Sequence, residues 1–333
     1  MDVLRRFEAL IETYDESHEF INVDLTTMLS EFKTETPIAV PYIDSPETFA
    51  DLPYVILHNF FNYCPEQFPL YALRCLYRVV TKNIDDIDTK PRLLIMLHLT
   101  KMSVVDLPEY INRFERLYVV PEETNTEIPL QLVDKAIKHP KLNKIINNLI
   151  KQSFGEEFAK HIGETNSIDV TVKLVATFEF ELRGFCGINI IYVNSTYFKN
   201  RRFQLGLTQL PETDKILVID ILTVVIHEYA HIRARQIANN CNHSTPKCIV
   251  EAVNENDPEF GRMIERALFS VPIDWMKSLD NNSVGIGYIE QFIEAIDKGE
   301  EIPILNATPK LIARTGSSLM HGGLDICVEQ SIE

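Results

Sequence analysis

The 333-residue sequence contains few cysteines, and their spacing excludes several classes of protein. There is no Cys-x-x-Cys pair, which most finger-type zinc sites require, and six cysteines are sparse for a chain of this length. Small secreted domains held together by disulfides are much richer in cysteine. We therefore expect reduced, mostly buried thiols at Cys64, Cys75, Cys186, Cys241, Cys248 and Cys327.

Long apolar runs and an excess of positive charge are also absent. No apolar run approaches the roughly 20 residues of a membrane-spanning helix. The N-terminal stretch MDVLRRFEALIETYDESHEF has no apolar signal region, so we expect a cytoplasmic protein. The net charge of −16 speaks against binding to nucleic acid or to an anionic membrane. It is compatible with basic peptide substrates.

The N-terminal third of the sequence reads as helical. Residues 119–126 are polar and contain a proline, which makes them the best linker candidate. We predict a helical N-terminal domain, residues 1–120, and a second domain, residues 121–333. The helices expected in the first domain are Leu4–Tyr14, Pro46–Tyr63, Pro65–Lys82, Arg92–Lys101 and Leu107–Leu117.

The second domain mixes helices with a small sheet. Residues 171–182 are β-branched and aromatic with alternating polarity, which indicates a strand, and residues 187–194 form a second one. Arg183 and Gly184 are expected to turn the chain between them. Helices are expected at 130–138, 142–161, 215–239, from Pro258 to Phe269, and 288–297. The predicted fold class is therefore α+β and mostly helical.

The helix expected at 215–239 contains no glycine or proline, and either Thr213 or Asp214 can cap its start. From Ile216 to Ile226 only Asp220 and Thr223 interrupt its apolar residues. A helix that is apolar almost all round lies inside a domain. Polar side chains within such a helix are costly unless they are bonded to something.

Three such side chains are His227, Glu228 and His231. The two histidines are four residues apart, so they lie on one helical face and can bind the same small cation. Glu228 lies about 100° around the helix from His227, within reach of a water on that cation but not of the cation itself. This is the HExxH arrangement, in which two histidines bind Zn²⁺ and the carboxylate is the general base.

The stretch Val224–Ile232, VVIHEYAHI, resembles the zincin metallopeptidases. The Gly-x-x-His extension of the metzincin branch is missing after His231. The resemblance therefore points to the gluzincin branch, in which the third zinc ligand is a glutamate on a following helix. It also implies a zincin-like catalytic domain with a small sheet and an active-site helix. In that superfamily the strand before the active-site helix lies along the cleft, and a peptide can add to its edge.

Three glutamates are candidates for the third ligand. Asp257 and Pro258 form a strong helix start, and a similar E-x-G-x-x-x-E string follows HExxH in poorly characterised zincin-like proteins. Within that string we favour Glu259, and Glu265 is its rival. Glu251, at a spacing resembling that of thermolysin-like enzymes, is the third possibility.

The functional prediction is a zinc-dependent hydrolase, a peptidase in which Glu228 takes a proton from a zinc-activated water. Its partner is then a peptide or protein substrate, and the sequence does not give the oligomeric state. Donors considered for the developing oxyanion are Tyr288, His243, Arg314 and His321. The alternative is a catalytically inactive zincin-like scaffold that binds a partner through its N-terminal helices. A protein that uses the metal only for structure is a third possibility.

Overall fold

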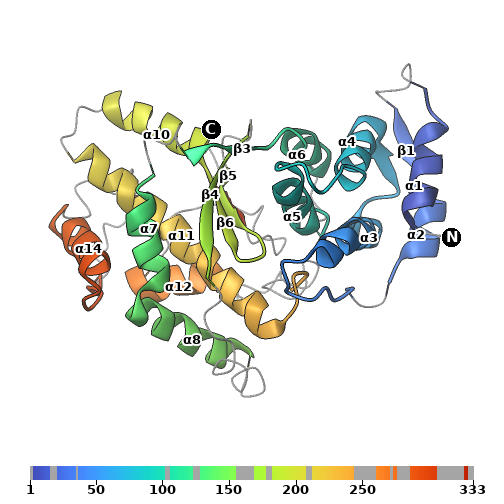
Figure 1. Cartoon of the computed structure of the whole chain (residues 1–333). Coiled ribbons are helices and arrows are strands. Elements are labelled where there is room, and N and C mark those ends of the chain that lie inside the picture. Colours follow the sequence, from blue (N-terminus) through green and yellow to red (C-terminus); the bar gives the residue numbers. More distant parts are fainter. Residues whose placement is uncertain are drawn as a thin grey trace.

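The computed structural model of the chain shows an α+β fold that is mostly helical, as predicted (Figure 1). It describes residues 3–15, 21–34, 37–101, 106–122, 128–154, 169–177, 182–207, 212–243, 260–270, 273–275, 286–305 and 326–328. Helices of the N-terminal part lie on one side of a small sheet, and the long helix with its neighbours lies on the other. In the described part of the chain no helix is both long and apolar enough to span a membrane.

The N-terminal part packs helices around an aromatic core. Its elements are α1 (Val3–Glu12), β1 (Asn22–Asp24), α2 (Thr26–Phe32), α3 (Pro46–Tyr63), β2 (Gln67–Pro69), α4 (Leu70–Val80), α5 (Thr89–Leu99) and α6 (Leu107–Phe114). Helix α3 has the predicted bounds, because the Ser45 hydroxyl accepts a hydrogen bond from Thr48 N at its start. The helix expected from Pro65 begins five residues later, because Phe68 pairs with Val23 in a two-stranded sheet.

A five-stranded sheet forms the centre of the molecule. Its strands are β3 (Tyr118–Val120), β4 (Thr171–Ala176), β5 (Leu182–Cys186), β6 (Ile190–Asn194) and β7 (Ile326–Val328), in the order β3-β4-β6-β5-β7. Strands β4 and β6 are parallel, and the other neighbours are antiparallel.

Two expectations about this sheet were wrong. Val119 and Val120, assigned to the linker, belong to β3, where they pair with Val175 and Leu174. Gly184, expected in a turn, lies inside β5. A Cβ there would come within 2.9 Å of Tyr192 O and of Val224 Cγ1, so glycine allows β5 to approach both β6 and the long helix.

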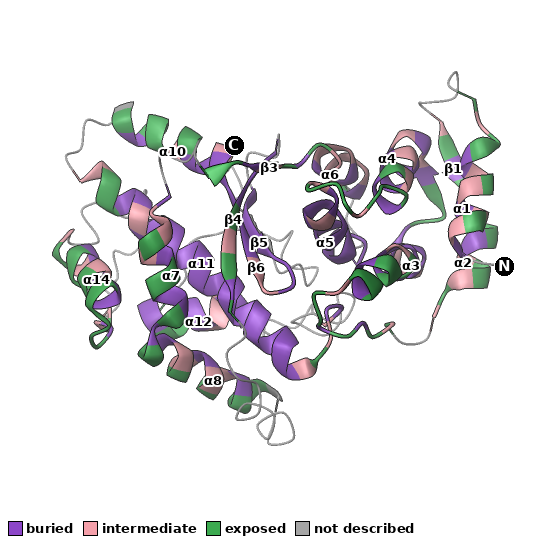
Figure 2. Ribbon diagram, viewed as in Figure 1, coloured by how far each residue is buried: buried purple, intermediate pink, exposed green. Residues whose placement is uncertain are grey.

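The remaining helices surround the far side of the sheet. They are α7 (Leu130–Lys138), α8 (Pro140–Phe154), α10 (Ser195–Leu207), α11 (Thr213–Ala238), α12 (Phe260–Phe269) and α14 (Ile286–Lys298). Helix α11 is the predicted long helix, and it is buried along most of its length (Figure 2). Thr213 and Asp214 lie in its first turn rather than capping it, since Glu212 is the N-cap residue.

The C-terminal end of α11 is fastened to the N-terminal part of the chain. Asn239 takes a left-handed conformation with φ of 46° and ends the helix. Beyond it, Cys241 N donates to Val40 O at 2.8 Å, and Asn240 Oδ1 accepts from Val40 N at 3.0 Å. Tyr42 N donates to Asn239 Oδ1 at 3.1 Å. These bonds hold the segment before α3 against the end of the long helix. The division into domains at residue 120 stays a prediction.

Candidate functional site

Helix α11 carries His227, Glu228 and His231 in the interior of the protein. Their exposed fractions are 0%, 0% and 1%. The centroids of the two imidazole rings are 5.1 Å apart. Two imidazoles that bind one tetrahedral zinc ion through Nε2, at 2.0–2.1 Å, place their centroids roughly 5.2 Å apart. The spacing of the rings therefore fits a shared ion.

Helix α12 lies directly against these rings. A Cβ built on Gly261 would come within 2.3 Å of His227 Nε2 and Cδ2 and within 2.4 Å of Cε1, so the glycine backbone covers the face of the imidazole. The ring of Phe260 lies at 6.4 Å from that of His231. The first turn of α12 thus fixes where both histidine rings can sit. A side chain at position 261 would displace the first of them.

Glu265, one turn further along α12, is bonded to His227. Its Oε1 lies 2.8 Å from Nδ1 of His227, and the glutamate is 1% exposed. An ionised carboxylate can only accept from this nitrogen, which places the ring proton on Nδ1 and the lone pair on Nε2. That is the tautomer a metal-binding histidine needs, and a carboxylate partner of this kind is common beside such ligands.

The placement of Glu265 bears on the choice of the third ligand. A carboxylate bonded to Nδ1 lies on the far side of the ring from an ion held at Nε2. This arrangement suits a residue that orients His227, and it does not suit the rival assignment of Glu265 as a ligand. Glu259 immediately precedes the first residue of α12 and, with Glu251, lies outside the described residues. The prediction of Glu259 as third ligand therefore stays a prediction.

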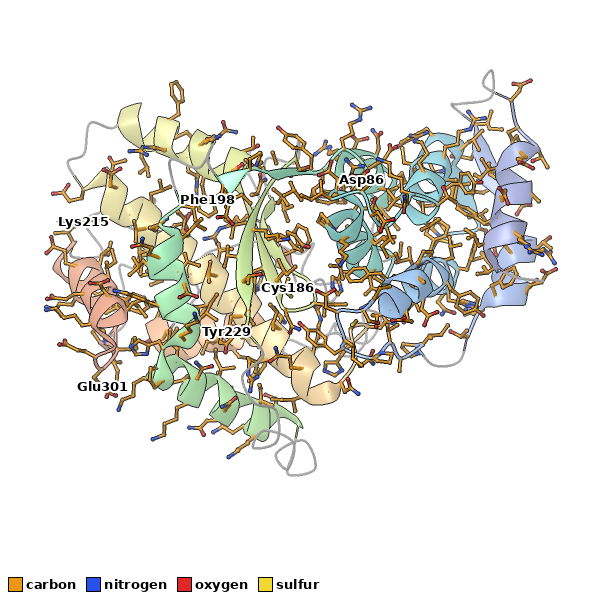
Figure 3. All side chains as sticks on the ribbon, in the orientation of Figure 1. Asp86, Cys186, Phe198, Lys215, Tyr229 and Glu301 are labelled. Atoms are coloured by element: carbon orange, nitrogen blue, oxygen red, sulfur yellow. The ribbon has the colours of Figure 1, made fainter. Side chains whose placement is uncertain are left out.

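A second polar group behind the motif was not found from the sequence. The Cys186 thiol, at the end of β5, lies beside the Glu228 carboxylate, which contributes to the raised pKa of the thiol. Arg235 Nη1 donates to Cys186 Sγ at 2.8 Å, and Arg235 Nη2 is 3.3 Å from Nδ1 of His98. Lys101 Nζ donates to Asn242 O at 2.9 Å and lies 3.5 Å from the same His98 nitrogen. Figure 3 shows Cys186 between α11 and the N-terminal helices.

Burial controls the ionisation of this group. Burial raises the pKa of Cys186, and the Glu228 charge adds to that effect, so the thiol keeps its proton. Burial is the main cause that holds the pKa of both His98 and Lys101 well below their usual values, and the Arg235 charge is the second. Only the fold reveals that His98 lies near His231, whose charge also lowers the pKa of His98.

The proposed oxyanion donors are not brought to the motif in the described part of the chain. The Tyr288 hydroxyl donates to Pro303 O at 3.2 Å. His243 follows the end of α11, where its carbonyl accepts from Arg235 Nε at 3.2 Å. Arg314 and His321 lie outside the described residues.

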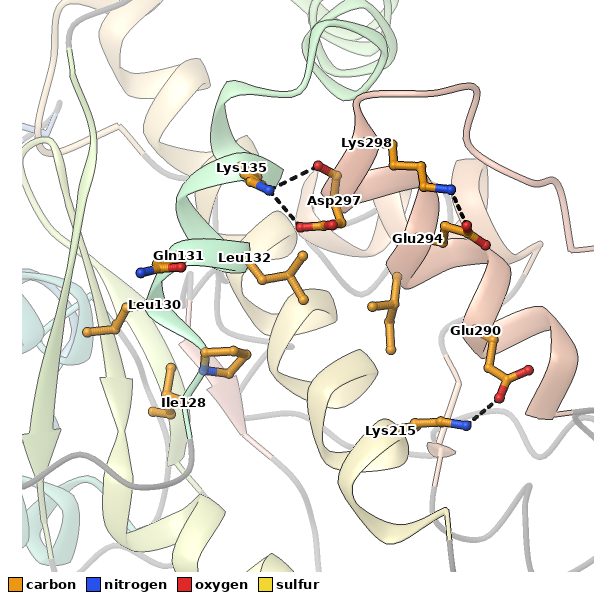
Figure 4. Close-up of a pocket in the computed structure, with 12 residues that line it drawn as sticks. Ile128, Leu130, Gln131, Leu132, Lys135, Lys215, Glu290, Glu294, Asp297 and Lys298 are labelled. Atoms are coloured by element: carbon orange, nitrogen blue, oxygen red, sulfur yellow. Dashed lines mark hydrogen bonds and ion pairs between the residues drawn. The ribbon is translucent and has the colours of Figure 1, made fainter.

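A groove formed by described residues lies away from the motif. It has a volume of about 740 Å³ and lies between α7, the start of α11 and α14 (Figure 4). Its floor is apolar, and ion pairs such as Lys135–Asp297, at 2.7 Å, stand on its rim. Lys215, which also lines it, is twelve residues before His227, about 18 Å along the helix. This groove is not part of the candidate metal site.

The candidate ligand set is incomplete in the described ranges. Among these residues no group of three or more His, Cys, Asp or Glu side chains is placed to hold a metal ion. The residue predicted to complete the set, Glu259, is not one of them. Comparisons of the chain with protein-family models, with curated proteins and with solved structures give no match.

Proposed function

We propose that the protein is a zinc-dependent hydrolase that cleaves peptide bonds, with Glu228 as the general base. The observation that carries the proposal is the geometry of the two histidines. They are fully buried on one face of α11, their rings have the separation expected for a shared ion, and Glu265 fixes the tautomer of His227. A chance pair of core histidines would not require any of these features.

The residues present fit a zinc site. His227 and His231 would hold the ion, and Glu259 is the predicted third ligand. A zinc ion held there supplies Lewis acidity, which acidifies a water molecule and polarises a substrate carbonyl. The buried surroundings strengthen this effect because they exclude competing water.

Glu228 is the residue that moves the proton. Its carboxylate accepts a proton from the attacking water, and the same group can then pass that proton to the leaving amine. The Cys186 thiol lies beside Glu228 and limits the space for its carboxylate, and Arg235 in turn holds the thiol through its 2.8 Å contact. The base is therefore oriented by residues from a strand and from its own helix.

The sheet supports a zincin-like domain as part of this proposal. In the superfamily that VVIHEYAHI resembles, a strand lies along the cleft beside the active-site helix. Here β5 runs beside α11, with Gly184 against Val224, one turn before the motif, and Cys186 against Glu228. Strand β5 is also antiparallel to both of its neighbours. It is the strand best placed to present an extended peptide to the motif.

The test compares two substitutions that the proposal separates. Glu228→Gln keeps the size of the side chain and removes the proton acceptor, so the variant should retain zinc and lose about 10²–10⁴ in the rate of peptide hydrolysis. His231→Ala should lose most of the zinc. Zinc per chain is measured by atomic absorption, and hydrolysis is measured on a peptide library by mass spectrometry. Wild-type protein that binds no zinc when it is supplied would refute the metal site.

A binding protein that has lost activity is the second candidate. It is favoured by one observation, the complete burial of His227, Glu228 and His231, which closes them to a substrate in this conformation. The same experiment separates the two functions. Zinc binding without hydrolysis of any peptide in the library would favour the scaffold, and a Glu228-dependent cleavage would favour the peptidase.

A further inference from the structure

The edge of β5 next to α11 is already occupied by another part of the same chain. Residues Ile326–Val328 form β7 and pair with β5 in antiparallel register, Gly184 opposite Cys327 and Phe185 opposite Ile326. Strand β7 also lies in contact with α11. A segment from near the end of the sequence thus takes the place beside the motif helix that an added strand would need.

The pairing of β7 with β5 matters for the motif because β5 lies beside it. Gly184 packs against Val224, and Cys186 lies beside Glu228, so β5 passes along the turn of α11 that carries the base. An extended peptide on the outer edge of β5 would therefore run past the motif, held by main-chain hydrogen bonds. In the structure that edge is taken and the motif residues are closed to solvent, with 0–1% exposure.

We propose that residues 326–328 act as a built-in competitor for the outer edge of β5, the edge on which the proposed function would place an extended peptide substrate. The inference rests on the proposed function, because it adds to that function a segment that restrains peptide binding. A peptide must displace β7 before it can reach Glu228.

The pairing is suited to displacement. Strand β7 has only three residues, and its register with β5 shifts between Leu182 and Gly184. A short, irregular ladder at a sheet edge offers few main-chain bonds, so it can open without disturbing the strands behind it. Because the competitor belongs to the same chain, its effective concentration at the edge is high, and it will lower the apparent affinity for any peptide in solution.

The test removes the main-chain donors of β7 in the full-length protein. The double variant Ile326→Pro, Cys327→Pro removes the donor that faces β5 whichever of the two residues supplies it, because proline has no N–H. The matched control, Ile326→Val, Cys327→Ser, changes both side chains and keeps both donors. All proteins also carry Glu228→Gln in the binding measurements, so that a bound peptide is not cleaved.

The probe is a fluorescein-labelled peptide with the sequence Leu-Asp-Ile-Cys-Val-Glu, and binding is followed by fluorescence anisotropy. If β7 occupies the edge nine-tenths of the time, the proline variant should bind the probe about tenfold more tightly than the protein with an intact β7. Hydrogen exchange at Leu182–Cys186 should speed up in the proline variant and slow again when the probe is added. A merely misfolded variant would not recover protection in this way.

A second arm restores Glu228 and measures hydrolysis of the peptide library. The proline variant should cleave faster than the control pair by a similar factor of about ten. Equal probe binding by the proline variant and the control would overturn the inference, even if both cleave peptides. Tighter probe binding with no cleavage in any zinc-loaded protein would keep the occupied edge and refute the proposed hydrolase instead.

Discussion

Gly261→Ala is the substitution that tests the packing of the metal site most directly. The new methyl group would lie 2.3 Å from Nε2 and Cδ2 of His227, whereas carbon and nitrogen atoms in contact need about 3.5 Å. The imidazole must therefore move by about 1 Å, or α12 must shift away from α11 by the same amount. Both helices are buried at this point, and neither movement is free.

The expected change in the free energy of unfolding follows from two opposing contributions. Alanine favours a helix over glycine by about 1 kcal/mol. Overpacking of a buried contact costs about 1–3 kcal/mol, and lengthening the 2.8 Å bond between His227 and Glu265 adds to this cost. We expect a net loss of about 1–2 kcal/mol in the free energy of unfolding. Since the ring also carries the metal-binding nitrogen, zinc affinity should fall by about 10–100-fold.

The chain offers a matched control for this experiment. Gly287 lies in α14, and a Cβ there would meet nothing within 4 Å. Gly287→Ala should therefore raise stability by up to about 1 kcal/mol and leave zinc affinity unchanged. Stability is measured by urea unfolding, and affinity by competition with a zinc-binding dye. If Gly261→Ala were as stable as wild type and bound zinc equally well, the close contact between α12 and the His227 ring would be refuted.

Two further predictions concern groups that support the motif. Glu265→Gln removes the carboxylate partner of His227 Nδ1, so zinc affinity should fall by about 10–100-fold, measured by the same dye competition; an unchanged affinity would show that Glu265 does not orient the ring. His98 faces Arg235, Lys101 and His231, and its pKa is far below the usual 6.5. Below pH 6.5 the unfolded chain therefore takes up a proton at His98 that the folded chain does not bind. The free energy of unfolding should therefore fall as the pH drops from 7 to 5, by up to about 1.4 kcal/mol per pH unit. His98→Gln should remove this contribution to the pH dependence when unfolding is measured with a chelator present.

Features that depend on neighbours within one helical turn could be predicted from the sequence. Ser45 and Pro46 define the start of α3, and the structure ends that helix at the predicted Tyr63. The apolar run of α11 predicts a buried helix, and the spacing of His227 and His231 places them on one face of it. These features are local, because hydrogen bonding and side-chain direction in a helix repeat every 3.6 residues.

Features that depend on partners far along the chain could be recognised only in the folded structure. Gly184 reads as a turn residue in isolation, and only the approach of Val224 and Tyr192 explains why a strand needs glycine there. Residues 119–120 look like a linker until β4 provides a partner for them. Strand propensity is weak without such partners, because pairing and burial supply most of a strand's stability.

The same distinction holds at the candidate site. The sequence identified His227, Glu228 and His231, but it gave no reason to connect them with Cys186 or with His98, which lie in apolar stretches of sequence in other elements. It also left Glu265 as a possible ligand, and the fold instead places its carboxylate at Nδ1 of His227. Motif spacing fixes which groups share a helical face, whereas the groups that orient them are brought there by packing between elements, which no local pattern encodes.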